Sequence, residues 1–198
     1  MYFTPSFVII KPMTKTLFKS FLQNPQNILF DGEDPDEKVL YVLRRSFITN
    51  LGWLLLTAAL VAIPWTFWND ILKILFNGTA AISPQFSTVL FLFWYLFTFG
   101  FFFQNFLNWF FNVYIISNKR IVDMDFYGLI YKRISESPLR NIEDVTSKIN
   151  GTAGVIFNFG DVFIQTAAEK TEFEFSDVDN PSKIRDILSD LVTEIKMK

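Results

Sequence analysis

The sequence contains neither cysteine nor histidine. Without cysteine the chain can form no disulfide, no thiolate nucleophile and no cysteine-bound metal centre. Without histidine it lacks the commonest general base and the commonest zinc ligand of proteins. A Ser-His-Asp triad and an HExxH zinc site therefore cannot be built, and we predict no catalytic residue, no metal and no cofactor.

Net charge is also small. The 198 residues carry a formal net charge of -2, so the chain has no general attraction for nucleic acid. No glycine-rich phosphate loop is present. The carboxylates that could serve an enzyme fall in predicted turns or at outward positions of predicted strands: Asp123, Asp125, Glu143, Asp144 and Asp161. Solvated carboxylates are expected at such positions, so an enzyme is the weaker interpretation.

Long runs without any charge are the strongest positive feature. One extends from Phe47 to Asn69 and a second from Ile74 to Asn118, with a loop of small residues in its first part. About 20 helical residues, each rising about 1.5 Å, cross the ~30 Å hydrocarbon core of a bilayer. We predict a two-helix transmembrane hairpin over residues 47–113, with spans at about 47–68 and 86–113. The second span is longer than one crossing needs and should tilt.

Basic residues predict the orientation of this hairpin. They lie before the first span and after the second: Arg44, Arg45, Lys119, Arg120, Lys132 and Arg133. The connecting segment has only Lys73, so both termini should be cytoplasmic and the protein should lie in the cell (inner) membrane. The same six residues could bind anionic lipid headgroups, although the positive-inside rule would select them without that role.

Polar amides recur on the second span. Gln104, Asn108 and Asn112 follow one another at four-residue intervals and form one stripe on a helix. Amides at membrane depth usually bond to a neighbouring helix. We predict that the stripe makes interhelical contacts, within the hairpin or between two copies. A polar path for an ion or substrate is the alternative.

Residues 1–46 are expected to form an N-terminal cytoplasmic segment. Lys11, Lys15 and Lys19 have helical spacing, which fits an amphipathic helix on the membrane surface or a solvated helix. An acidic linker follows, and residues 38–45 could then form a short helix or a strand.

Residues 114–198 form a predicted cytoplasmic domain with strands followed by a helix. Seven short strands are predicted: Val113–Ser117, Arg120–Phe126, Leu129–Ser135, Ile142–Ile149, Val155–Asn158, Val162–Thr166 and Thr171–Phe175. Asn150–Gly151 and Phe159–Asp161 are expected to be turns. Pro181 should begin a helix. Its apolar face combines Ile184, Ile187, Leu188, Leu191, Val192 and Ile195.

Four short motifs carry a family resemblance: Tyr114–Ile121 (YIISNKRI), Pro138–Val145 (PLRNIEDV), Phe159–Val162 (FGDV) and Asp179–Pro181 (DNP). In this order they resemble the bacterial pleckstrin-homology-like domains of the membrane-attached type, over roughly residues 38–195. The resemblance implies a membrane α-helical hairpin plus an α+β domain. That domain would be a PH-like seven-stranded antiparallel barrel capped by a C-terminal helix.

The resemblance implies a fold rather than a ligand. Eukaryotic PH domains that bind phosphoinositides use a basic cluster at the first strand turn. Here only Lys119 and Arg120 occupy that place, and Asp123 and Asp125 follow closely. No flexible linker separates Val113 from Tyr114, so the domain should be held firmly at the membrane.

We therefore expect a non-enzymatic, membrane-anchored scaffold or protein-interaction module. Its partners would be the lipid bilayer and an unidentified membrane or cytoplasmic protein, or further copies of itself in a homo-oligomer. The alternative is recognition of anionic lipid headgroups by the six juxtamembrane basic residues.

Overall fold

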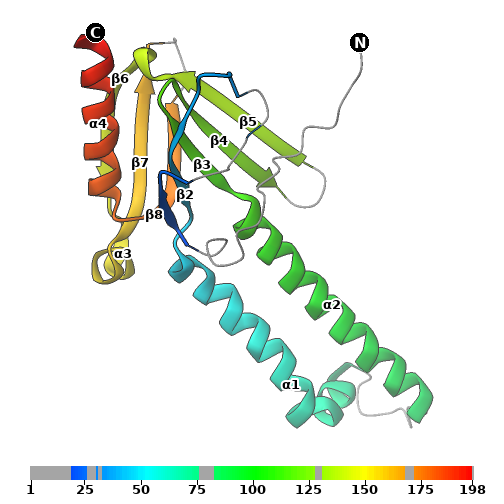
Figure 1. The fold of residues 1–198 in the computed structure, drawn as a ribbon. Coiled ribbons are helices and arrows are strands. Elements are labelled where there is room, and N and C mark those ends of the chain that lie inside the picture. The colour runs from blue at the N-terminus through cyan, green and yellow to red at the C-terminus, as the bar shows by residue number, and fades with distance from the viewer. Residues whose placement is uncertain are drawn as a thin grey trace, which may run out of the picture.

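The computed structural model describes residues 19–25, 30, 33–75, 83–127, 131–167 and 172–197. Two long helices leave one end of a β-rich body, and the C-terminal helix packs along that body (Figure 1). The predicted amphipathic helix around Lys11 and Lys15 lies outside the described residues.

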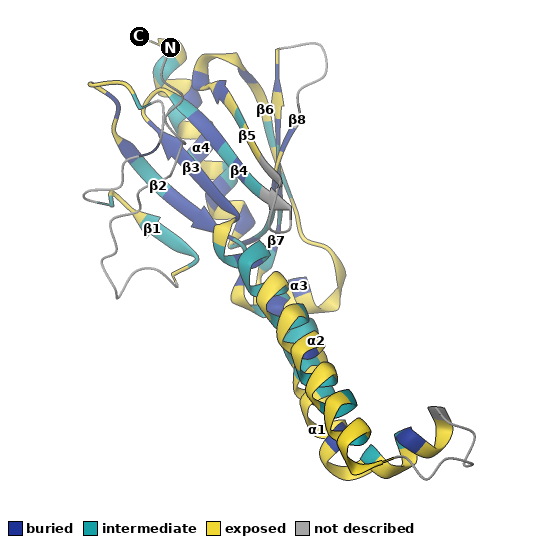
Figure 2. Cartoon of the chain, turned by 90° about the vertical axis from the view of Figure 1, so that its right-hand side faces the viewer, coloured by how far each residue is buried: buried dark blue, intermediate teal, exposed yellow. Residues whose placement is uncertain are grey.

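The two long helices are α1 (Leu51–Leu75), preceded by the 3-10 turn η1 (Phe47–Asn50), and α2 (Pro84–Phe111). Ser83 caps α2 by accepting from the Phe86 backbone N–H, and Pro84 occupies the first turn, where its missing N–H costs nothing. Both helices are long and apolar enough to cross a membrane. Their most apolar windows are only 11% and 6% buried, so they are not core helices of the β-rich body (Figure 2).

The body contains eight strands among the described residues. They are β1 (Phe21–Gln23), β2 (Val39–Arg44), β3 (Val113–Ser117), β4 (Arg120–Tyr127), β5 (Tyr131–Pro138), β6 (Ile142–Lys148), β7 (Phe159–Thr166) and β8 (Glu172–Asp179). All pairings are antiparallel, in one sheet of order β1-β2-β3-β4-β5 and a second of order β6-β7-β8. The 3-10 turn η2 (Leu139–Asn141) leads from the first sheet to the second.

The two sheets are not closed into one barrel, which corrects the predicted closed seven-stranded barrel. Between the two sheets the structure records an isolated bridge, Arg45 to Val178. The strand count after the hairpin is also lower than predicted: six described strands follow α2, not seven.

The missing strand is a helix. Val155–Asn158 was predicted to be extended, but it falls in and just after α3 (Gly151–Phe157). Three consecutive apolar residues, followed by Asn158, are too few for periodicity to separate a strand from a helix. Asn158 adopts a left-handed conformation with φ 53°, which ends α3 and turns the chain into β7.

The helical hairpin is an insertion between two neighbouring strands. β2 comes before α1 and β3 comes after α2, yet they pair in register, with Arg44 opposite Val113 and Leu43 opposite Tyr114. Residues 38–45, which the sequence left open between helix and strand, are thus mostly strand. The five-stranded sheet draws on residues both before and after the hairpin.

One apolar core lies between the two sheets and under α4 (Pro181–Met197). It includes Leu43, Tyr114 and Phe175, and the predicted apolar face of α4 contributes Ile184, Leu188 and Val192. The predicted C-terminal helix and its start at Pro181 are therefore confirmed. A second cluster covers the other face of the five-stranded sheet: Phe30, Val39, Val42, Val113, Ile115, Val122 and Met124.

Candidate functional site

The junction between hairpin and sheet is built from buried polar groups. Arg44 is only 3% exposed, and its Nη1 donates to the Phe110 carbonyl at 2.8 Å. That carbonyl belongs to the last turn of α2, where carbonyls lack helical partners and a cation is favoured. The guanidinium carbon also lies 5.0 Å from the centroid of the Phe110 ring. Arg44 of β2 therefore bonds directly to the end of α2.

The residues at the start of the hairpin also form hydrogen bonds with distant parts of the chain. Trp109 Nε1 of α2 donates to the Arg45 carbonyl at 3.1 Å, and the Ser46 backbone N–H donates to the Asp177 carbonyl at 2.7 Å. Asn112, the C-cap residue of α2, is only 3% exposed. These bonds join the end of α2 to β2 and the residue after it, and they join the start of the hairpin to β8, so the hairpin and the domain should move together.

A charged cluster lies beside this junction. The pKa of Asp123 is raised to about 7, first because burial disfavours the carboxylate and then because Asp125 is nearby, while Arg133 and Arg45 oppose the shift. Asp123 Oδ1 has no hydrogen-bond partner in the described part of the chain. Burial also raises the pKa of Asp177, with Asp161 adding to the effect.

Arg45 is the cation of this cluster. Burial alone would lower its pKa, but Tyr114, Asp177 and Asp125 outweigh burial and raise it. The Tyr114 hydroxyl accepts from the Ser176 backbone N–H at 3.1 Å. No group of three or more carboxylates in the described ranges is arranged to hold a metal ion. Arg45, Asp123 and Asp177 are half-buried, so the cluster places charges of opposite sign in a partly buried region between the sheets.

A second ionic network occupies the opposite end of β3. Arg120 Nη2 lies 2.7 Å from the buried Glu37 carboxylate, and Arg120 Nη1 lies 2.9 Å from Glu136. The hydrogen bond to Glu37 raises the pKa of Arg120. Burial alone would raise the pKa of Glu37, but hydrogen bonds from Arg120 and Ser117 lower it overall. Lys119 pairs with Asp34 at 3.1 Å.

The six predicted headgroup residues do not form one patch. Arg44 and Arg45 are engaged in the junction. Lys119 and Arg120 lie beyond the far end of β3, whose five residues put them roughly 16 Å from the helices. Arg133 is exposed on the edge strand β5, opposite Asp125 in register. Lys132 precedes it in β5, and its side chain is outside the described residues.

The amide stripe is divided among different environments. Gln104 is exposed, Asn108 is half-buried and Asn112 is buried at the junction. Because Gln104 is exposed in this chain, a second copy is the better-placed partner for the interhelical contact predicted for it. That contact stays a prediction.

Two of the hydrogen bonds that join α1 to α2 lie beside Pro64. Proline has no N–H, so the Leu60 carbonyl loses its normal helical partner. Trp94 Nε1 of α2 donates to this carbonyl at 2.9 Å, and the Tyr95 hydroxyl donates to the Val61 carbonyl at 3.0 Å. These two bonds were not predicted from the sequence. The available signal was a proline inside one apolar run facing a tryptophan in the other.

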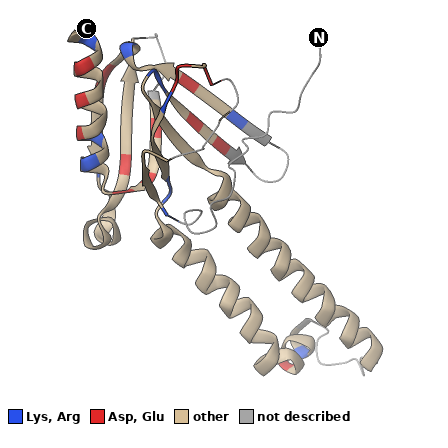
Figure 3. Ribbon diagram, viewed as in Figure 1, with Lys and Arg blue, Asp and Glu red and all other residues tan. Residues whose placement is uncertain are grey.

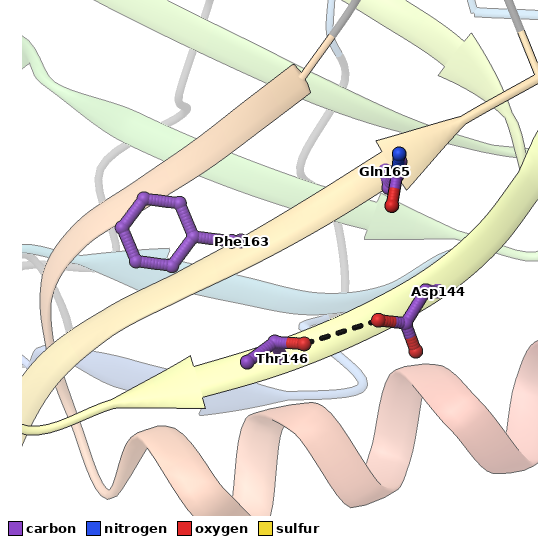
Figure 4. A pocket seen from close by; sticks show the side chains of 4 residues that line it. All are labelled: Asp144, Thr146, Phe163 and Gln165. Atoms are coloured by element: carbon purple, nitrogen blue, oxygen red, sulfur yellow. Dashed lines mark hydrogen bonds between the residues drawn. The ribbon is translucent and has the colours of Figure 1, made fainter.

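Charge in the hairpin itself is confined to its far end, where Lys73 and Asp70 pair at 3.2 Å (Figure 3). Elsewhere, a shallow depression on the outer face of β6 and β7 is lined by Asp144, Thr146, Phe163 and Gln165 (Figure 4). Thr146 Oγ1 donates to Asp144 Oδ2 at 3.1 Å. With an acid and an amide but no cation in its lining, this depression offers nothing suited to an anionic headgroup.

We compared the sequence with known protein families. A family profile described as "Bacterial PH domain" matches residues 46–192. The chain belongs to the bacterial PH domain family. This confirms the resemblance that the four motifs carried. A search of curated proteins gives no match.

Among solved structures, the bacterial PH domain chain is similar to a protein with a pleckstrin-homology domain from Shewanella loihica PV-4. The identity is 14%, the alignment covers 41% of this chain and 70% of that chain, and the TM-score is 0.33.

Proposed function

We propose that this bacterial PH domain protein is a membrane-anchored, non-enzymatic scaffold or protein-interaction module at the cytoplasmic face of the cell membrane. The observation that carries the proposal is the insertion of the helical hairpin between the paired strands β2 and β3, with Arg44 opposite Val113. An anchor built into the sheet holds the domain at a fixed height and orientation. Such a domain is better suited to organising membrane neighbours than to capturing soluble partners.

Membrane insertion is supported by the exposure of the helices. Large apolar side chains such as Leu55, Trp65 and Phe93 are 62%, 79% and 69% exposed. Monomeric soluble proteins rarely expose apolar surface of this extent. A bilayer would cover it, whereas water would not.

The cytoplasmic orientation follows from charge. The basic residues before and after the hairpin lie on the domain side, and the far end carries Lys73 alone with Asp70 beside it. The positive-inside rule then places the domain and both termini in the cytoplasm.

Single-cysteine labelling tests membrane spanning and orientation in this cysteine-free chain. With an impermeant maleimide on intact cells, Gln85→Cys should react and Ser189→Cys should react only after permeabilisation. The reverse pattern would overturn the orientation. Release of the chain from membranes by alkaline carbonate would overturn spanning altogether.

The scaffold role is tested by cross-linking in native membranes followed by purification of the tagged chain. A specific membrane or cytoplasmic protein, or a second copy, should be captured. Capture of neither would contradict the scaffold role. The lipid-headgroup alternative has less support, because four of its six candidate residues are engaged in the junction or at the distal end of β3.

A further inference from the structure

The second apolar surface of the molecule is small and lies on α3. Outside residues 47–111, the exposed large apolar side chains among the described residues are Ile134, Ile149, Val155, Ile156, Phe157 and Met197. Four of these six fall between positions 149 and 157. Val155, Ile156 and Phe157 are 69%, 73% and 51% exposed, although they are consecutive. From Ile149 to Gly160 the sequence has no charged residue.

This exposure is not a consequence of loose folding. Gly154 of α3 is buried and packs so closely that an added Cβ would lie 3.0 Å from the Phe159 carbonyl oxygen and 3.2 Å from the Ile149 side chain. The Asn180 backbone N–H donates to the Asn158 carbonyl at 2.9 Å. One side of α3 is therefore fixed to the body while its apolar side chains project outward.

Register places α3 at the end of the body from which the hairpin leaves. Gly160, just after α3, pairs with Val178, and Val178 bridges to Arg45, just before the hairpin. Figures 1 and 2 both show α3 at this end of the body, and Figure 1 shows it near the start of α1. The exposed apolar side chains of α3 therefore lie at the same level as the first turns of the hairpin. In those turns, Phe47 and Leu51 are 59% and 50% exposed.

We propose that α3 inserts its apolar side chains into the interfacial region of the same bilayer leaflet from which the hairpin enters the domain. This deepens the proposed function and rests on it, because the hairpin defines the membrane surface. α3 would be a second, monotopic contact that fixes the tilt of the domain. Interfacial helices bind in this way by burying apolar side chains at the boundary of headgroups and acyl chains.

The length of the hairpin helices favours this contact. α2 has 28 residues and is about 42 Å long, whereas the hydrocarbon core is about 30 Å thick. A helix with this mismatch tilts. Figure 1 shows the hairpin leaving the body obliquely, away from α3, so that a tilted hairpin brings α3 down to the membrane surface. Lys148, exposed at the end of β6 beside the run, can meet lipid phosphates.

The test uses the full chain in proteoliposomes with one cysteine carrying an environment-sensitive dye. Ile156→Cys places the dye on α3, Leu92→Cys places it on the outer side of α2, and Thr193→Cys places it on the exposed face of α4. The liposomes contain lipids with a quenching nitroxide near the headgroup end of the acyl chain. The dyes at Ile156 and Leu92 should be quenched, and the dye at Thr193 should remain bright and accessible to iodide.

Each other outcome is decisive. A dye at Leu92 that escapes the nitroxide overturns the proposed function, and the α3 contact falls with it. In a second outcome, the nitroxide quenches the dye at Leu92, while the dye at Ile156 is not quenched by the nitroxide and is accessible to iodide. This result leaves the membrane anchor intact and overturns the α3 contact alone. Protection of the Ile156 dye from both quenchers would show that a second protein copy, rather than lipid, covers α3, which also overturns the proposal.

Discussion

At the scale of single residues, the burial of Asp123 links stability to pH. The pKa of this carboxyl group is about 7 in the folded protein, against roughly 3.9 in an unfolded chain. Below the lower value both states are protonated and burial costs nothing. As pH rises towards 7 the unfolded state loses its proton first, so the folded state is progressively destabilised, and above 7 the full penalty is present.

We predict that Asp123→Asn raises the unfolding midpoint slightly at pH 4.5, where the penalty has only begun to develop, and raises it much more at pH 8. The groups facing Asp123 are Asp125, Glu174, Arg133 and Arg45, and all four are present in both proteins. Comparing variant with parent at each pH therefore isolates Asp123. Thermal unfolding of the full chain in detergent, followed by circular dichroism, provides the measurement. Asp190→Asn, on the exposed face of α4, is the matched control and should shift the midpoint equally at both pH values.

A second residue-scale prediction concerns Gly160. A Cβ at this position would lie 2.3 Å from the Lys148 carbonyl oxygen and 3.0 Å from the Ile149 Cα, both backbone atoms. Gly160→Ala must therefore separate β6 from β7, and overpacking of this kind costs about 1–3 kcal/mol. Gly52→Ala meets nothing within 4 Å and is the control. Equal unfolding midpoints for the two variants would contradict the close approach.

The conformation of the chain at Gly160 could not be predicted from the sequence. Phe159–Asp161 was predicted to be a turn, but Phe159 and Gly160 begin strand β7 and Gly160 pairs with Val178. The glycine is needed because a neighbouring backbone approaches closely, which a single sequence does not reveal. Arg44 and Arg45 were likewise identified as basic residues near the membrane. Their bonds to Phe110 and Tyr114 could not be seen, because they depend on pairing between distant strands.

At the scale of elements, long patterns could be predicted and short ones could not. The two charge-free runs and the apolar face of α4 each extend over several turns, and both patterns correspond to helices in the structure. α3 has seven residues, and its Val-Ile-Phe run suits a strand by propensity, so tertiary context decides its conformation.

The pairing of α1 with α2 yields a prediction for Trp94. Trp94→Phe should destabilise the hairpin by about 0.6–2 kcal/mol, because the Leu60 carbonyl freed by Pro64 loses its donor. In a Pro64→Ala background the residue-64 N–H can bond that carbonyl, so the same change should cost much less. Trp65→Phe, at a side chain that is 79% exposed, is the control. Unfolding of all variants in detergent completes the double-mutant cycle. If Trp94→Phe lowered the free energy of unfolding equally in both backgrounds, the hydrogen bond from Trp94 would not compensate for the N–H that Pro64 lacks.

At the scale of the whole molecule, the hairpin is a long connection between two adjacent strands. Arg44 and Val113 face each other across an antiparallel pair, where Cα atoms lie about 4.5–5.5 Å apart. A turn of two to five residues can join strands at this distance. The domain therefore does not need the hairpin for chain connection, but it does need β2. Leu43 of β2 is 1% exposed within the core between the sheets.

We therefore predict that residues 1–46 joined to residues 112–198 through a short Asn-Gly turn give a soluble, monomeric domain that unfolds cooperatively in detergent-free buffer. The matched control is the fragment 112–198 alone. This fragment lacks β2, so the backbone groups along the edge of β3 would be unpaired. Tyr114 would also lose Leu43, the residue opposite it on β2. This fragment should aggregate or unfold without a cooperative transition. Analytical ultracentrifugation and circular dichroism compare the two proteins directly. If fragment 112–198 were monomeric with the same unfolding midpoint as the joined chain, β2 would be dispensable, and the hairpin would precede the folded domain rather than interrupt it.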